Sequence, residues 1–198
     1  MRTRFPRTKT AMQLTIRSSA VRSICLLILL PILGCRTPGS DTDQTGPVPE
    51  AAKTVDGLIH ALYASVSFDR GGPDWTLFRA LVLPGSVYIA TERGKSPMKV
   101  MDLEAFVQDF RDFIADQDVA SRGFHENLTR IDSTEFGNIA HAFTVFEPTI
   151  GDAPRSRRGV DSIQLVKQDG RWWVASITTQ FEHEGLKAPK SLFDRGND

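Results

Sequence analysis

The amino-acid sequence predicts an α+β domain, a cone-shaped α+β barrel of three N-terminal helices packed on a curved, mainly antiparallel sheet. Three observations support this fold class. Apolar residues recur at helical spacing between residues 51 and 114. From Phe124 onward the apolar period changes to two, which is typical of strands. Short turns join these strands as hairpins, and helices followed by a strand meander are the order of an α+β domain.

Three helices are expected in the first half of the domain. The first runs from about Ala51 to Phe68 and ends at a Gly-Gly-Pro sequence. The second is short, has Asp74 as its cap and is broken by Pro84, and the third follows Asp102. Their apolar stripes are Val55, Leu58, Ile59, Leu62 and Val66, then Trp75, Phe78, Leu81 and Val82, then Leu103, Phe106, Val107, Phe110, Phe113 and Ile114.

Five strands are expected around and after these helices. A short strand at 87–90 lies between the second and third helices. The other four are rich in aromatic and β-branched residues and span 124–133, 138–146, 159–167 and 172–181. Turn residues near Gly137 and Gly170 and a loop at 151–158 connect them, so an antiparallel meander is predicted.

Residues 1–34 have the order of an export signal. Six basic residues and no acidic residue lie in this segment, and the apolar stretch from Ile24 to Leu33 is ten residues long. That is about half of the roughly 20 residues that a membrane-spanning helix needs. The sequence from Ile32 to Cys35 resembles the bacterial lipobox, so cleavage after Gly34 and lipidation of Cys35 are expected.

The alternatives to lipidation are a conventional signal peptide or an uncleaved anchor. Either would leave Cys35 as an unpaired thiol, because the processed chain has no other cysteine. We therefore expect a lipid anchor on a membrane of the cell envelope, on the periplasmic side or in the outer membrane of a Gram-negative cell. Translation can start at Met1 or at Met12, where a signal of ordinary length would begin.

The processed chain divides into three parts by composition. Residues 35–50, rich in proline and glycine, are expected to form a flexible tether. Residues 51–185 hold the folded domain, and 186–198 form a polar C-terminal tail. Without the six basic residues of the signal, 18 basic residues face 24 acidic ones. This acidic balance argues against a nucleic-acid partner, since such binding depends on Lys and Arg.

This arrangement resembles the nuclear transport factor 2-like superfamily, especially its polyketide-cyclase-like (SnoaL-like) branch, over nearly all of residues 51–184. The resemblance lies in the Asp74-Trp75 helix start, in the Arg158-Gly159 strand start and in the final hairpin from Asp169 into a strand that ends at Gln180. It implies a concave pocket between the sheet and its covering helices. Proteins of this fold include isomerases, dehydratases and binding modules, so the fold alone does not identify a function.

The resemblance implies that an isomerase-type site would need a carboxylate base with hydrogen-bonding partners in an apolar pocket. Asp161 is the candidate base, and its candidate partners are His125 and His141 on neighbouring strands and Tyr88 on the short strand. The simpler interpretation of Asp161 is a solvent-facing strand residue, because alternation groups it with Ile163 and Leu165 without showing which face is covered. The simpler interpretation of His125 is a structural histidine.

A wider set of residues is expected to line the pocket. Ser162 and Gln164 form the alternative inward face of their strand, and Asn127 shares a face with His125. The final hairpin contributes Trp172 and Gln180. Of the neighbouring pair formed by Trp172 and Trp173, one ring should be in the core and the other outside it.

No metal site and no cofactor are expected, since no set of residues has ligand spacing and no phosphate loop or nucleophile elbow appears. Three functions remain open. The first, slightly favoured by sequence alone, is an anchored module that binds a small apolar ligand. The second is a metal-free isomerase or dehydratase, and the third is an interaction module of an envelope assembly. A homodimer through the sheet face is a further expectation.

Overall fold

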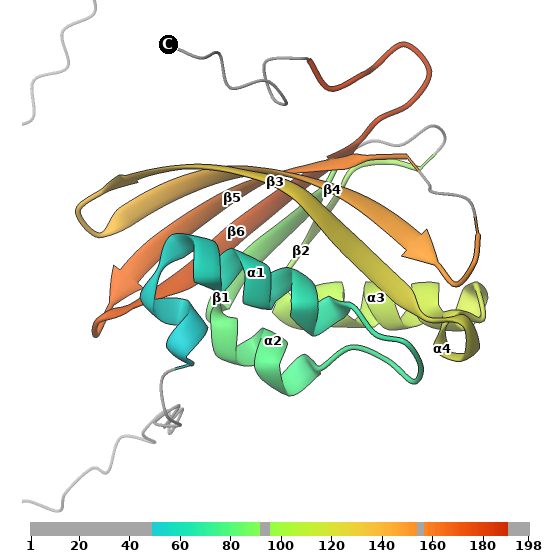
Figure 1. Cartoon of the computed structure of the whole chain (residues 1–198), viewed down its shortest axis with the longest axis horizontal. Coiled ribbons are helices and arrows are strands. Elements are labelled where there is room, and N and C mark those ends of the chain that lie inside the picture. The colour runs from blue at the N-terminus through green and yellow to red at the C-terminus, as the bar shows by residue number, and fades with distance from the viewer. Residues whose placement is uncertain (1–48, 92–95, 154–156, 190–198) are drawn as a thin grey trace, which may run out of the picture. The chain divides into compact units, whose positions relative to one another are not determined.

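The computed structural model describes residues 49–91, 96–153 and 157–189, and Figure 1 shows their arrangement. The predicted export signal, Cys35 and nearly all of the tether lie outside the described residues. In chain order the elements are a 3-10 helix η1 (Glu50–Lys53), α1 (Val55–Val66), α2 (Trp75–Leu81), β1 (Val82–Ala90), β2 (Lys99–Met101), α3 (Leu103–Asp116), α4 (Val119–Arg122), β3 (Phe124–Phe136), β4 (Ile139–Ile150), β5 (Gly159–Gln168) and β6 (Arg171–Phe181).

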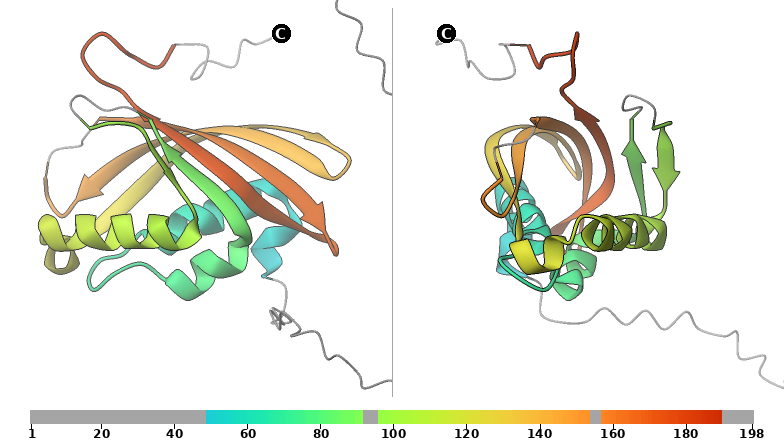
Figure 2. Two further views of the ribbon diagram at one scale, coloured as in Figure 1. Left: turned by 180° about the vertical axis from the view of Figure 1, so that it is seen from behind. Right: turned by 90° about the vertical axis from the view of Figure 1, so that its right-hand side faces the viewer.

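The strands form one curved sheet in the order β2-β1-β6-β5-β4-β3. The pairing of β1 with β6 is parallel, and all the other pairings are antiparallel. Helices α1 and α2 lie under the concave face of the sheet, and the strands curl around them (Figures 1 and 2). The predicted α+β class, with helices on a mainly antiparallel curved sheet, is confirmed.

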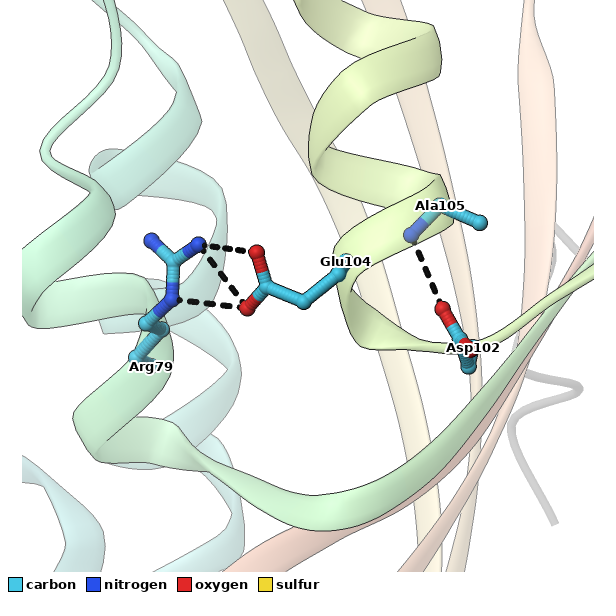
Figure 3. Close-up of polar contacts among 4 residues, drawn as sticks. All are labelled: Arg79, Asp102, Glu104 and Ala105. Carbon is cyan, nitrogen blue, oxygen red and sulfur yellow. Dashed lines mark hydrogen bonds and ion pairs between the residues drawn. The ribbon is translucent and has the colours of Figure 1, made fainter.

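Each of the three main helices begins at a side-chain cap. The hydroxyl of Thr54 accepts a hydrogen bond from the peptide N–H of Gly57. The carboxylates of Asp74 and Asp102 accept from the peptide N–H groups of Leu77 and Ala105. Such caps satisfy donors that the first turn leaves free. Figure 3 shows the Asp102 cap beside a bidentate ion pair in which Arg79 of α2 contacts Glu104 of α3.

The core lies between α1 and the concave face. All five residues of the predicted α1 stripe are buried, and they pack on the inward residues of the sheet: Ala140, Ala142, Phe146, Ile163, Leu165, Trp172 and Val174. Burying an aliphatic or aromatic side chain of this size contributes roughly 1.5–3 kcal/mol. The apolar interior therefore fixes α1 against the centre of the sheet.

Three details differ from the sequence prediction. The structure has a fourth helix, α4, and a short strand, β2, that were not predicted. Strand β1 begins at Val82, directly after α2, and not at Val87. It accommodates Pro84 and Gly85 in a stretch between Val82 and Val87 where the pairing with β6 is irregular, so the proline displaces no regular ladder bond there. Among the described residues, no helix has the length and apolarity to cross a membrane.

Gly159, at the start of β5, has no room for a side chain. A Cβ there would meet the buried ring of Phe146 well inside van der Waals contact, whereas a Cβ on Gly85 in β1 would meet nothing. We predict that Gly159→Ala lowers the free energy of unfolding by about 1–3 kcal/mol through overpacking. The matched Gly85→Ala variant should stay within about 0.5 kcal/mol of the wild type. Urea denaturation measures both, and equal stabilities would contradict this packing.

Candidate functional site

Asp161 points into the interior of the domain. It lies on β5, pairs with Thr144 of β4 and Thr179 of β6, and shares the inward face with the core residues Ile163 and Leu165. Its exposed fraction is 6%. The interpretation of Asp161 as a solvent-facing strand residue is therefore wrong, because the helices cover this face of β5.

The carboxylate of Asp161 contacts a tyrosine from the first helix. The hydroxyl of Tyr63 donates a hydrogen bond to Asp161 Oδ2 at 2.6 Å and lies 2.6 Å from the hydroxyl of Thr144. A tyrosine hydroxyl has one proton, so Thr144 is the donor to Tyr63 when Tyr63 donates to Asp161. The result is a directed chain of hydrogen bonds from β4 through α1 to β5.

The second carboxylate oxygen of Asp161 has no hydrogen-bond partner of standard geometry among the described residues, although it is buried. Burial raises the pKa of Asp161 to about 6, and the hydrogen bond from Tyr63 together with the nearby side chain of Thr179 limits the rise. An unpaired buried acceptor costs free energy unless a ligand or a proton satisfies it. Asp161 therefore has one oxygen held by Tyr63 and one available for a proton.

Glu126 is a second carboxyl on the same side of the sheet. It lies on β3 between the inward residues Phe124 and Leu128, is partly buried, and its peptide N–H donates to the hydroxyl of Ser67. Burial, followed by the negative charge of Asp161, raises its pKa to about 8. At neutral pH Glu126 is thus a neutral acid, whereas Asp161 is mostly ionised. The two carboxyls have opposite roles available, one as a donor and one as an acceptor of protons.

Aromatic rings lie beside Tyr63. The ring of Tyr63 lies 5.5 Å from that of Phe146, which in turn lies 5.7 Å from that of Phe181. Burial, the charges of Asp161 and Glu126 and the hydrogen bond to Asp161 together hold the pKa of Tyr63 well above its ordinary value. The hydroxyl of Tyr63 is therefore a permanent donor at physiological pH.

The sequence prediction grouped Asp161 with His125 and Tyr88, and the structure separates the three. His125 alternates with Glu126 and so lies on the other face of β3, where its Nε2 is 3.1 Å from the exposed carboxylate of Asp69. Tyr88 is buried on β1, stacked on Phe106 at 4.3 Å. The expected contact of Asp161 with His125 or Tyr88 is thus replaced by its contact with Tyr63.

Ser162 and Gln164, the predicted alternative pocket residues of β5, lie on the outward face. Ser162 Oγ is 3.0 Å from Nε2 of His141 on the neighbouring strand. Gln164 is exposed and pairs with Ser176 of β6. The expectation that these two residues point into the interior is wrong, because Asp161 and Ile163 occupy the inward positions.

The remaining predicted pocket residues are dispersed over the domain. Asn127 is exposed on the outward side of β3, and Trp172 is fully buried in the core. Gln180, near the end of β6, is partly buried and accepts a hydrogen bond from the hydroxyl of Thr91 at 2.7 Å. These three residues do not form one site. Within the described ranges there is also no group of three His, Cys, Asp or Glu residues that could hold a metal ion.

Tyr63, Thr144 and Glu126 were missed in the sequence. The signal for Glu126 was present, because alternation places this carboxylate on one face with Phe124 and Leu128, both apolar. Tyr63 extends the apolar stripe of α1, since it follows Ile59 by four residues. Its contact with Asp161 joins positions 98 residues apart, which helical spacing cannot reveal.

Comparison with solved structures identifies the fold. The domain is similar to a nuclear transport factor 2-like protein of unknown function from Pseudomonas putida, with 15% identity, 70% of this chain and 93% of that chain covered, and a TM-score of 0.52. It is also similar to cystatin-like-fold proteins of unknown function from Nostoc punctiforme (13% identity, 63% and 86% covered, TM-score 0.50) and Caulobacter vibrioides (12% identity, 69% and 93% covered, TM-score 0.50).

These likenesses agree with the resemblance seen in the sequence and establish the nuclear transport factor 2-like fold. At identities this low they establish the fold alone. No protein-family model matches the sequence, and no curated protein matches it. The chemistry of the site therefore has to be argued from its own residues.

The raised pKa of Glu126 predicts a pH dependence of stability. The folded state holds this proton more tightly than the unfolded state, so the contribution to stability is fully present below pH 4.5 and is lost as the pH rises to about 8. Glu126→Gln cannot ionise. Its free energy of unfolding should exceed that of the wild type by an amount that grows over this range to roughly 2–4 kcal/mol.

Urea denaturation at several pH values measures this difference. Glu135→Gln, at an exposed position of the same strand, is the matched control for loss of a carboxyl charge. If the difference in the free energy of unfolding between Glu126→Gln and wild type stays constant across the pH range, the surroundings of Glu126 do not shift its pKa.

Proposed function

We propose that this nuclear transport factor 2-like domain is the working part of a membrane-anchored extracytoplasmic lipoprotein, and that its interior transfers a proton on a small, largely apolar molecule. The reaction class is that of a metal-free isomerase or dehydratase. The observation that carries the proposal is the buried hydrogen bond from Tyr63 to Asp161 Oδ2, while Asp161 Oδ1 is buried without a hydrogen-bond partner among the described residues. A second carboxyl, Glu126, is protonated at neutral pH and is influenced by the charge of Asp161.

In such a reaction Asp161 is the general base. Its Oδ1 accepts a proton from a carbon next to a carbonyl group of the substrate. The electron pair of that C–H bond forms a C=C bond, and the π pair of the carbonyl group moves onto its oxygen. Neutral Glu126 donates a hydrogen bond to this developing oxyanion. Return of the proton from Asp161 to another carbon completes an isomerisation. In a dehydration the β-hydroxyl group leaves as water by taking the proton now held by Asp161, which restores the carboxylate.

Tyr63 and Thr144 serve the base in this scheme. The hydrogen bond from Tyr63 fixes Oδ2, so the carboxylate cannot rotate, and it also limits the rise of the Asp161 pKa. A base with a pKa of about 6 is ionised at neutral pH and still basic enough to accept a proton. The aromatic surroundings favour a substrate whose body is apolar.

Binding without turnover is the second candidate function. The same apolar surroundings and the same two carboxyls would hold a small ligand that has one hydrogen-bonding group, as a carrier or sensor requires. The two functions differ in their dependence on Asp161. A binder needs hydrogen-bonding capacity there, which Asn retains, whereas proton transfer needs a base.

We predict that Asp161→Asn lowers the rate of proton abstraction from 5-nitrobenzisoxazole, a small aromatic probe of buried carboxylate bases, by roughly 100-fold or more. The wild-type rate should rise with pH through about 6, as Asp161 ionises, and should fall above about 8, where Glu126 loses its proton. The released phenolate is followed by absorbance.

Two variants sharpen this assay. Tyr63→Phe removes a hydrogen bond that lowers the Asp161 pKa, so the rising limb should move to higher pH. His125→Gln, on the outward face, should leave the profile unchanged. If Asp161→Asn and wild type have the same rate while both bind the probe, the domain is a binder and the catalytic proposal fails.

The anchor is proposed from the sequence at Ile32 to Cys35, which fits a lipobox after a short apolar core. We predict that protein purified from membranes has an intact mass corresponding to a chain that starts at Cys35 and carries acyl groups. Cys35→Ala should lack the acyl groups. A wild-type protein that retains residues 1–34 without modification would contradict both the anchor and the extracytoplasmic location.

A further inference from the structure

The outward face of the sheet has a row of apolar residues at one end. Phe136, Ile139, Val166 and Trp173 stand in register across β3, β4, β5 and β6, so their side chains share the outward face. The exposed fraction is 82% for Phe136 and 59% for Ile139, and the other two are partly buried. We call these four residues the apolar row.

The apolar row ends at the turn between β3 and β4. Phe136 and Ile139 flank the two-residue turn between β3 and β4, in which Gly137 has a positive φ of 60°. Two large apolar side chains that are exposed side by side are unusual on a surface that contacts only water, and such patches commonly mark interaction sites. The turn therefore presents an apolar tip.

The described chain begins at the same end of the domain. Figures 1 and 2 show η1 and the start of α1 at the end of the sheet that carries the β3–β4 and β5–β6 turns. The first turn of α1 lies beside β3 there, since Ser133 Oγ is 3.5 Å from Asp56 Oδ1. Only 13 residues separate Cys35 from Pro49, and a flexible coil of that length spans roughly 20 Å.

We propose that the apolar row docks on the lipid bilayer, with Phe136 and Ile139 inserted among the headgroups and upper acyl chains. This inference rests on the proposed lipid anchor at Cys35, because a short tether from the same end of the domain keeps the row close to the membrane surface. Aromatic and aliphatic side chains at an exposed turn suit the membrane interface. In the docked domain the end of the sheet that carries the β3–β4 and β5–β6 turns would face the lipid.

The charges near the apolar row indicate whether it would bind lipid by apolar insertion or by electrostatic attraction. Glu135 and Asp169 are exposed in the two turns at this end, and the guanidinium of Arg171 is buried against the ring of Trp173 at 3.6 Å. No excess of exposed positive charge is therefore present among the described residues of these two turns. Docking depends on apolar insertion, so neutral phosphatidylcholine vesicles are the appropriate probe.

The test uses the full lipidated chain in phosphatidylcholine vesicles with a single introduced cysteine. Asn138→Cys places an environment-sensitive fluorescent label in the β3–β4 turn, and Asp152→Cys places the same label in an exposed loop beyond the opposite end of β4. We expect nitroxide groups on the lipid acyl chains to quench the label at 138 and to leave the label at 152 bright. Adding Phe136→Ser and Ile139→Ser should abolish quenching at 138, with unchanged circular dichroism.

The outcomes separate this inference from the anchor. Equal lipid quenching at 138 and 152, or none at either position, in a protein whose mass confirms acylation would overturn the docking and leave the anchor in place. A label at 138 that is shielded both from lipid nitroxides and from aqueous iodide would show that a second copy of the chain covers the row, which also overturns it. Selective quenching at 138 in a chain without acyl groups would support docking while refuting the anchor.

Discussion

The hydrogen bond from Tyr63 to Asp161 is the contact on which the interior of this domain depends. It joins the first helix to the centre of the sheet at 2.6 Å, and the hydroxyl of Thr144 extends it to the next strand. Without a donor at this place, a carboxylate among aromatic rings would be a buried charge with no partner, which costs several kcal/mol. The position of α1 therefore determines both the packing of the interior and the hydrogen bonding of Asp161.

The same contact helps to give the two carboxyls of the site different protonation states. Tyr63 occupies one oxygen of Asp161, and the other has no hydrogen-bond partner in the part of the chain that the structure describes, while the negative charge of Asp161 helps to hold the proton on Glu126. Two carboxyls of the same chemical type thus differ in charge at neutral pH because their surroundings differ. An apolar interior with this division is equipped for proton transfer and for the recognition of a polar group on an apolar ligand.

The helices and the main strands followed from sequence periodicity, since the α1 stripe from Val55 to Val66 and the alternation after Phe124 each reflect one covered face. The orientation of Asp161 did not follow. Alternation shows that Asp161 and Ile163 share a face of β5, but only the position of α1 shows that this face is the covered one. Tyr63 and Glu126 entered the site through contacts between distant elements, which local spacing cannot predict.

The parallel pairing of β1 with β6 sets the order in which the domain can be completed. Strand β1 lies next to the last strand of the sheet, and residues 91–170 separate the two strands in the sequence. Such long-range pairing is slow to form, because a large loop must close before any contact offsets its entropy. Until β6 has been synthesised, β1 has no neighbour on that side. The β1–β6 pairing is therefore expected to close the sheet late, after the local hairpins of β3, β4 and β5 can already have formed.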